Sequence, residues 1–159
     1  KYDMPAVEVR QGLDEITKRG AEVGFCFNFN DDSRTWNTFD AHRIIHWAQG
    51  LGKAVEMKKS LFTAYFIHNL NPGDHLLPAE LAEQTGPARN TAAEVLASGS
   101  YAEEVKKAID LWKDRGVSAV PTVRLGKKRS FTGAQTVPAL ERAIRASLEG
   151  TYTPGTPLM

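Results

Sequence analysis

Residues 116–125, GVSAVPTVRL, contain the feature that decides the fold. A charged segment with helical spacing ends at Gly116, four small or apolar residues follow, and Thr-Val-Arg-Leu then has the composition of a β-strand. Pro121 stands directly before this strand, although a proline cannot donate a hydrogen bond to a neighbouring strand. Position 121 therefore serves a purpose other than strand pairing.

The residues after this stretch predict a hairpin and a final helix. RSFTG, residues 129–133, is a second strand-like stretch, and the short Gly-Lys-Lys between the two predicts a tight turn. TVPALERAIRASLEG, residues 136–150, has Leu140, Ile144 and Leu148 at helical spacing. The tail, residues 149–159, is rich in proline and glycine, and we expect it to be flexible.

The hairpin tip is basic, with Lys127, Lys128 and Arg129 in a row. We interpret it as a charged turn that protects a sheet edge from pairing, with a phosphate contact as the alternative.

The residues before this stretch predict mainly helices. Apolar residues recur at helical spacing over residues 5–23, 37–52, 53–70, 76–86, 87–99 and 100–116. Thr38 is the expected N-cap of the second of these helices. In the last one, Val105, Ala108, Ile109 and Trp112 are expected to face inward. The exception is FCFNFN, residues 25–30, whose alternating phenylalanines predict a short strand or extended segment.

A two-stranded hairpin alone is marginally stable in water. Val123, Leu125 and Phe131 therefore need a sheet partner or a helix to cover them. Either the helical middle of the chain covers them, or the hairpin completes a sheet whose other strands are absent from these residues.

Composition narrows the class of protein. The chain has 159 residues, 42% of them hydrophobic, and its 20 basic and 19 acidic side chains nearly balance. This charge gives no reason to expect a nucleic-acid or membrane partner. KYDMPAVEVR has no apolar signal-peptide core, and a single cysteine rules out an internal disulfide framework. We therefore expect a cytoplasmic protein, although a chain that starts at Lys1 is compatible with a removed leader.

Three separated motifs resemble one known family. They are NTFDAHRIIHWA at residues 37–48, SGSYAEEV at 98–105 and FTGAQTVPALERAI at 131–144, in addition to the GVSAVP stretch. Together they resemble DsbA-like proteins with a thioredoxin fold, and most closely the FrnE-like thiol–disulfide oxidoreductases. The similarity runs over roughly residues 1–148 and implies an α/β, thioredoxin-like fold with an inserted helical domain.

The resemblance also implies a division of the chain and a binding site. Residues 1–36 would end the first thioredoxin part, 37–115 would form the helical insert, and 116–148 would form the second thioredoxin half. In the family a cis proline begins this strand, so the Val120–Pro121 bond is expected to be cis. The backbone of Val120 would pair with a bound protein or peptide disulfide substrate, and Pro121 would shape the groove.

Further residues match family motif positions and are expected near the site: Asn37, Thr38, His42, Gly133 and Gln135.

The chain departs from the family in its cysteines. The family's Cys-x-x-Cys motif opens its first helix, whereas this chain has Cys26 alone. We expect that a β–α–β segment carrying the motif is missing or lies upstream, which leaves no catalytic residue in these 159 positions. An incomplete sheet would expose an edge with which a second copy could pair, giving a homodimer.

Cys26 lies within FCFNFN and not at a helix start, so we interpret it as a residue without a catalytic role, although one thiol can still form a mixed disulfide.

His42 and His46 are four residues apart, as in half of a zinc site, but no third ligand is evident and no metal is expected. The aromatic group Phe25, Phe27, Phe29 and Trp36 fits core packing best, with a hydrophobic peptide groove as the alternative.

Three functions remain open. The first is a FrnE-like oxidoreductase or isomerase acting on protein disulfides without an organic cofactor. The second is a relative of 2-hydroxychromene-2-carboxylate isomerase or kappa-type glutathione transferase, which would use glutathione. The third is a peptide-binding module that has lost its redox chemistry.

Overall fold

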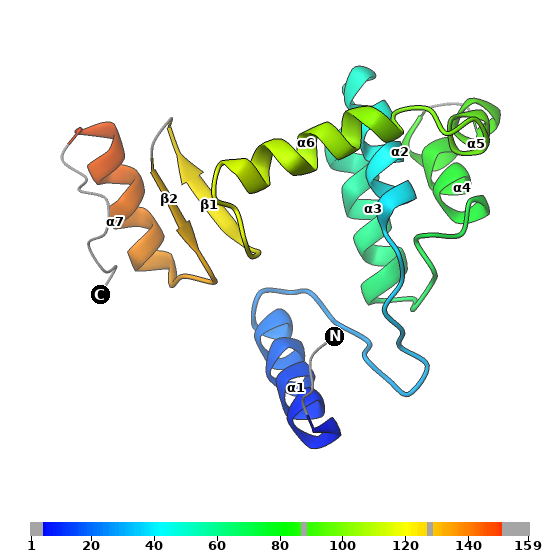
Figure 1. The fold of residues 1–159 in the computed structure, drawn as a ribbon. Coiled ribbons are helices and arrows are strands. Elements are labelled where there is room, and N and C mark those ends of the chain that lie inside the picture. The colour runs from blue at the N-terminus through cyan, green and yellow to red at the C-terminus, as the bar shows by residue number, and fades with distance from the viewer. Residues whose placement is uncertain (1–4, 87–88, 127–128, 151–159) are drawn as a thin grey trace. The chain divides into compact units, whose positions relative to one another are not determined.

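The computed structural model describes residues 5–86, 89–126 and 129–150 (Figure 1). The described residues divide into two compact units, one ending at Lys106 and the other beginning at Lys107. The predicted tip residues Lys127 and Lys128 and the tail beyond residue 150 lie outside the described residues.

Helices make up most of the first unit. They are α1 (Ala6–Glu22), α2 (Phe39–Gly50), α3 (Ala54–Phe66), α4 (Leu76–Thr85), α5 (Arg89–Ala97) and the start of α6 (Ala102–Asp114). Among the described residues, no helix has both the length and the apolar character needed to cross a bilayer.

Helices α2 to α5 form a tightly packed group that we call the helical module. Helix α2 packs against α3 and α5, and α4 packs against the same two helices. Ile44 and Met57 are completely buried between them. The wider core cluster consists of Ala41, Ile44, Trp47, Ala48, Met57, Leu61, Ala64, Ala79, Leu81, Ala82, Ala92, Val95 and Leu96. The apolar stripe predicted on α2 is therefore the centre of a real hydrophobic core.

Helix α1 runs through Gly20, where a close contact requires a glycine. A Cβ on Gly20 would lie 2.5 Å from the Phe27 ring and 2.6 Å from the Phe25 carbonyl oxygen. The absence of a side chain lets the segment after the helix fold back against α1.

This segment, residues 25–30, is extended, and no strand is formed there. The predicted alternation is present in its exposure, because the three phenylalanines are half-buried while Cys26, Asn28 and Asn30 are exposed. Asn28 anchors the segment to the end of α3: its backbone N–H donates to the Phe66 carbonyl at 2.9 Å, and its side-chain amide donates to the Ile67 carbonyl at 3.1 Å. Without a neighbouring strand, these bonds replace a sheet ladder.

The second unit, which we call the hairpin unit, contains the rest of α6, β1 (Thr122–Leu125), β2 (Arg129–Thr132) and α7 (Val137–Leu148). The strands pair antiparallel, with Thr122 opposite Thr132 and Val123 opposite Phe131. The predicted hairpin is therefore confirmed. Within the described residues each strand has one neighbour, so the other edge of β1 has no strand partner there.

Helix α7 begins as its sequence predicts, at a threonine followed by a proline near the first turn. The Thr136 hydroxyl accepts a hydrogen bond from the Ala139 N–H at 3.4 Å, which makes Thr136 the N-cap. The buried residues of α7 are Ala139 and Ala143, whereas Ile144 and Leu148 are exposed.

Candidate functional site

The loop at residues 116–121 connects α6 to β1 and is held at both ends. At the α6 end, the Gly116 N–H donates to the Lys113 carbonyl at 2.8 Å, and the Val117 N–H donates to the Trp112 carbonyl at 3.0 Å. At the β1 end, the Thr122 hydroxyl donates to the Ala119 carbonyl at 2.7 Å. The peptide bond between Val120 and Pro121 is cis, which confirms that prediction.

Val120 is an accessible position of this loop. The residue is 88% exposed. Among the residues that the structure describes, its backbone N–H and C=O have no hydrogen-bond partner. Val120 lies two residues before the start of β1, so these two groups are placed to pair with an extended segment.

Two of the other predicted residues lie next to this loop. The Gly133 N–H donates to the Pro121 carbonyl at 2.8 Å, and the Gln135 side-chain amide donates to the Gly133 carbonyl at 3.4 Å. Gly133 has a φ of +90°, a conformation that favours glycine. The fold therefore brings Pro121, Gly133 and Gln135 into one hydrogen-bonded group in the hairpin unit.

The remaining predicted residues, Asn37, Thr38 and His42, lie in the first unit at the start of α2. Thr38 occupies the predicted N-cap position of α2, but its side chain makes no capping hydrogen bond. Instead the Asn37 side-chain oxygen accepts from the Phe39 N–H at 3.0 Å. Asparagine is an equally good residue for this role, so sequence preference did not separate the two positions.

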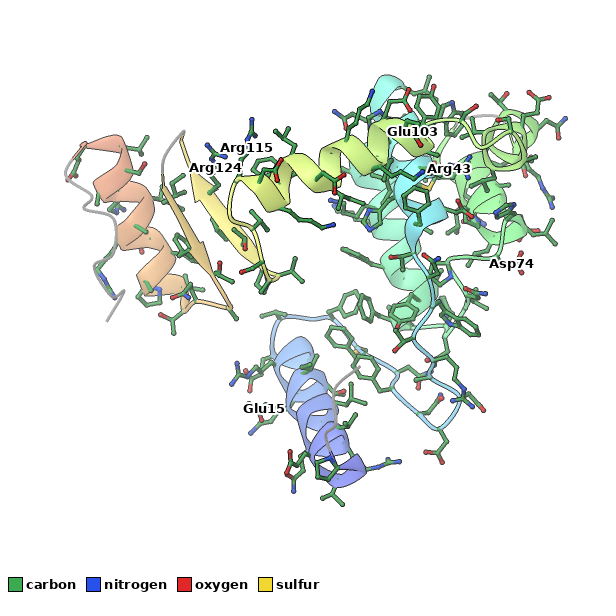
Figure 2. All side chains as sticks on the ribbon, viewed as in Figure 1. Glu15, Arg43, Asp74, Glu103, Arg115 and Arg124 are labelled. Atoms are coloured by element: carbon green, nitrogen blue, oxygen red, sulfur yellow. The ribbon has the colours of Figure 1, made fainter. Side chains whose placement is uncertain are left out.

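Arg43, within the motif at residues 37–48, has a structural role that its sequence position did not predict. Arg43 is 4% exposed and ends at the C-terminus of α5, where its guanidinium donates to the Val95 and Leu96 carbonyls (Figure 2). Its Nε also donates to the Ser100 carbonyl at 2.8 Å. A buried cation at a helix C-terminus satisfies carbonyls that have no partner within the helix. In the sequence, only the position of Arg43 within an apolar helical stretch indicated that this arginine is buried.

Asp40 balances this cation. Its carboxylate lies 2.7 Å from Arg43 Nη1 and 2.8 Å from His75 Nε2. Burial alone would raise the pKa of Asp40, but the hydrogen bonds and charges of Arg43 and His75 lower it below the ordinary value. The contact between His75 and Asp40 spans 35 residues and leaves no local pattern in the sequence.

The two histidines considered as metal ligands have other surroundings. Partial burial of the His42 ring lowers its pKa, and the charge of Lys58 lowers it further. The His46 ring packs against Tyr101, with ring centroids 5.4 Å apart. In the described ranges no three histidine, cysteine or acidic residues gather in a way that could hold a metal ion.

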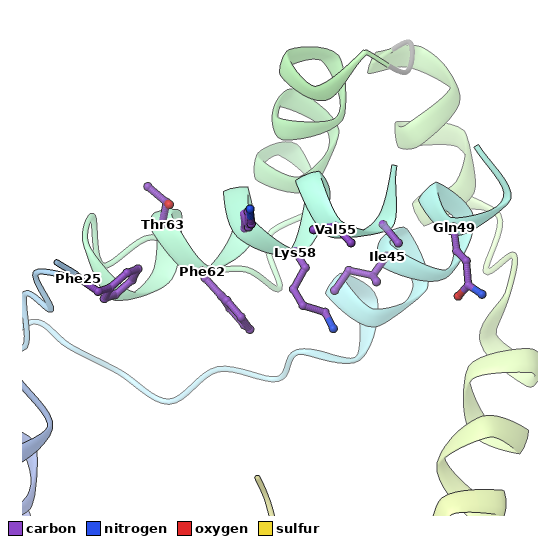
Figure 3. Close-up of a pocket in the computed structure, with 9 residues that line it drawn as sticks. Phe25, Ile45, Gln49, Val55, Lys58, Phe62 and Thr63 are labelled. Carbon is purple, nitrogen blue, oxygen red and sulfur yellow. The ribbon is translucent and has the colours of Figure 1, made fainter. Parts of the chain in front are cut away.

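Some residues of the aromatic group predicted from the sequence pack against one another, and one of them also lines an open groove. Phe27 and Phe29 stack at 5.2 Å, and Phe27 also contacts Phe66 at 5.3 Å. Phe25 packs edge-on against Phe27, with ring centroids 4.7 Å apart, and also lines a groove of about 700 Å³ along α2 and α3. Figure 3 shows Phe62 and Lys58 extending from the same side of α3. The groove residues are Phe25, Ile45, Gln49, Ala54, Val55, Lys58, Lys59, Phe62 and Thr63. Cys26, beside Phe25, is an exposed free thiol.

The fold and a family model identify the class of protein. A helical module inserted before a proline-initiated hairpin and a final helix is the arrangement of a DsbA-like thioredoxin fold. A family model for the DSBA-like thioredoxin domain matches residues 4–145. The chain therefore belongs to the DSBA-like thioredoxin domain family. Its single cysteine means that these 159 residues contain no Cys-x-x-Cys pair.

A solved structure of a probable DsbA oxidoreductase from Streptomyces coelicolor is similar to this chain, with a TM-score of 0.84. The match covers 98% of this chain and 67% of the other, at 24% sequence identity. At this identity the likeness shows the fold alone. A search of curated proteins found no match.

Proposed function

We propose that this chain supplies the polypeptide-binding part of a DsbA-like thiol–disulfide oxidoreductase that acts on protein disulfides. Family membership supports the reaction class. The observation that carries the proposal is the pair of backbone groups on the exposed residue Val120, which have no hydrogen-bond partner among the described residues. A bound segment would be added as a short strand, so its backbone provides affinity without a fixed sequence.

The thiol chemistry requires two cysteines that are not among residues 1–159. In such a reaction a thiolate attacks one sulfur of a disulfide, the other sulfur leaves as a thiolate, and a mixed disulfide forms. A second thiolate then attacks the mixed disulfide and releases the substrate. The chain's own contribution is to hold the substrate segment beside the reacting sulfurs.

The FrnE-like group is our proposal for the subfamily. Its support is the set of motifs at residues 37–48, 98–105 and 131–144. The single cysteine favours a second candidate, a peptide-binding module without redox chemistry. Thiol–disulfide exchange measured on the full-length gene product separates the two: turnover supports the oxidoreductase, and binding without turnover supports the module.

The binding claim is tested with substitutions at Val120. Val120→Pro removes the N–H, whereas Val120→Ala keeps both backbone groups and shortens the side chain. We expect the proline variant to weaken the binding of a fluorescein-labelled unfolded peptide about tenfold, measured by anisotropy, and the alanine variant to change it less than about threefold.

Modifying the peptide instead of the protein makes the test independent of any folding defect in the Val120 variants. A peptide carrying one N-methylated central amide should bind the unmodified protein several-fold more weakly than its parent. Equal affinity for every N-methyl position along the peptide would show that no strand is added at Val120.

A further inference from the structure

Trp112, in the last turns of α6, lies beside two cations. The guanidinium carbon of Arg115 is 5.0 Å from the centroid of the Trp112 ring, and that of Arg124 is 5.6 Å away. Both distances fall within the range of a cation–π interaction. The ring remains 42% exposed. All three residues belong to the hairpin unit, and Figure 2 shows Arg115 and Arg124 close to β1.

These three residues, which we call the Trp–Arg cluster, flank the candidate binding loop in the sequence. Arg115 is the last residue before the loop, and Arg124 is the third residue after Pro121. The Trp112 carbonyl accepts the hydrogen bond from the Val117 N–H. A strand rises about 3.3 Å per residue, so Arg124 lies roughly 10 Å along β1 from Pro121. This separation is within the length of one bound peptide segment.

Charge indicates what the cluster binds. Two guanidinium groups beside one exposed ring give the cluster a local positive charge, which attracts an anion. Among the described residues, the Arg115 side chain has no carboxylate partner. Arg124 Nε donates to the Gly126 carbonyl at 3.1 Å, which orients the rest of its guanidinium group. A guanidinium matches a carboxylate in geometry and binds it with two parallel hydrogen bonds.

We propose that the Trp–Arg cluster selects polypeptide segments that carry an aspartate or glutamate a few residues from the position paired with Val120. The proposal rests on the proposed function, because it assigns a sequence preference to the same binding loop. The exposed Trp112 ring supplies apolar contact area, and the two arginines supply charge. Tryptophan and arginine are the residue types that most often dominate binding energy at protein interfaces.

The experiment compares two peptides of equal length on the complete 159-residue chain. One carries glutamates three and four residues from its centre, and the other carries glutamines at the same positions. We expect the acidic peptide to bind about five- to tenfold more tightly in low salt, measured by fluorescence anisotropy. The difference should decrease strongly in 0.5 M NaCl, because the cluster is exposed to solvent.

Matched variants assign the preference to the cluster. The double variant Arg115→Gln/Arg124→Gln should reduce the preference to less than about twofold while leaving the affinity for the glutamine peptide unchanged. Arg115→Lys/Arg124→Lys keeps the charges and should restore part of the preference. Arg145→Gln, which changes an exposed arginine on α7 of the same unit, should leave the preference intact.

The outcomes separate this inference from the proposed function. Equal binding of both peptides by the unmodified chain overturns the acidic preference and leaves strand binding in place. Binding of neither peptide overturns both. If the glutamine double variant loses both peptides equally and the lysine double variant restores both equally, the cluster only supports the loop, and the proposal is wrong.

Discussion

The helical module and the hairpin unit bury very different amounts of apolar surface. In the helical module, Ile44 and Met57 are fully buried within one continuous cluster. In the hairpin unit, the described residues with the least exposure are two alanines, and Ile144 and Leu148 of α7 are 46% and 84% exposed. Hydrophobic stabilisation scales with the area removed from water, so most of this chain's stability resides in the helical module. The candidate binding loop lies in the other, less stabilised unit.

The difference in burial between the helical module and the hairpin unit can be tested by replacing one isoleucine in each with alanine. Ile44→Ala should lower the free energy of unfolding by about 3 to 4 kcal/mol, because it leaves a cavity in a closed core. Ile144→Ala should cost less than about 1 kcal/mol, because that side chain is already partly in water. Urea unfolding followed by circular dichroism measures both. Equal losses would remove the distinction between the two regions.

Replacing one arginine in each region compares the contribution of a buried and of an exposed charged group to stability. Arg43→Leu should destabilise the protein by about 3 kcal/mol, since it leaves α5 carbonyls and Asp40 without their partner. Arg145→Leu removes an exposed pair with Glu141 and should cost no more than about 0.5 kcal/mol. If Arg43→Leu proved neutral in the same urea titration, the buried network would not stabilise the helical module.

Asp40 gives a smaller effect that depends on pH. Its pKa is lowered in the folded state, so its stabilisation is present above the ordinary value of 3.8 and is lost as the pH falls through the lowered pKa. Asp40→Asn should therefore cost about 1 kcal/mol at pH 7, and this cost should decrease as the pH falls below 3.8. Asp110→Asn, at an exposed pair with Lys113, is the control and should have little effect at either pH. A pH-independent cost of Asp40→Asn would contradict the assigned charge interactions.

The sequence predicted the local elements better than the contacts between them. The hairpin and the helix capped by Thr136 were predictable because turn and capping residues act within a few positions. The inward face assigned to α6 was only partly right: Val105 is buried, but Ile109 and Trp112 are 38% and 42% exposed. Helical spacing reveals an apolar face without revealing whether the fold supplies something to cover it.

The candidate site was predictable where a family motif coincided with local backbone geometry. Val120 and Pro121 could be located from GVSAVP, because a proline before a strand is unusual. Arg43 and His75 could not be assigned, since their partners lie 52 and 35 residues away. The Trp–Arg cluster likewise joins a helix end to a strand, and only the folded chain brings those side chains together.

The measurement that tests the central claim most directly is amide proton exchange at Val120 by NMR, with and without a saturating unfolded peptide. An added strand would hydrogen-bond the Val120 N–H, so its exchange should slow by about tenfold or more while the Ile44 amide stays unchanged. Peptide binding that leaves Val120 exchange unaffected, with new protection confined to the helical module, would contradict the account.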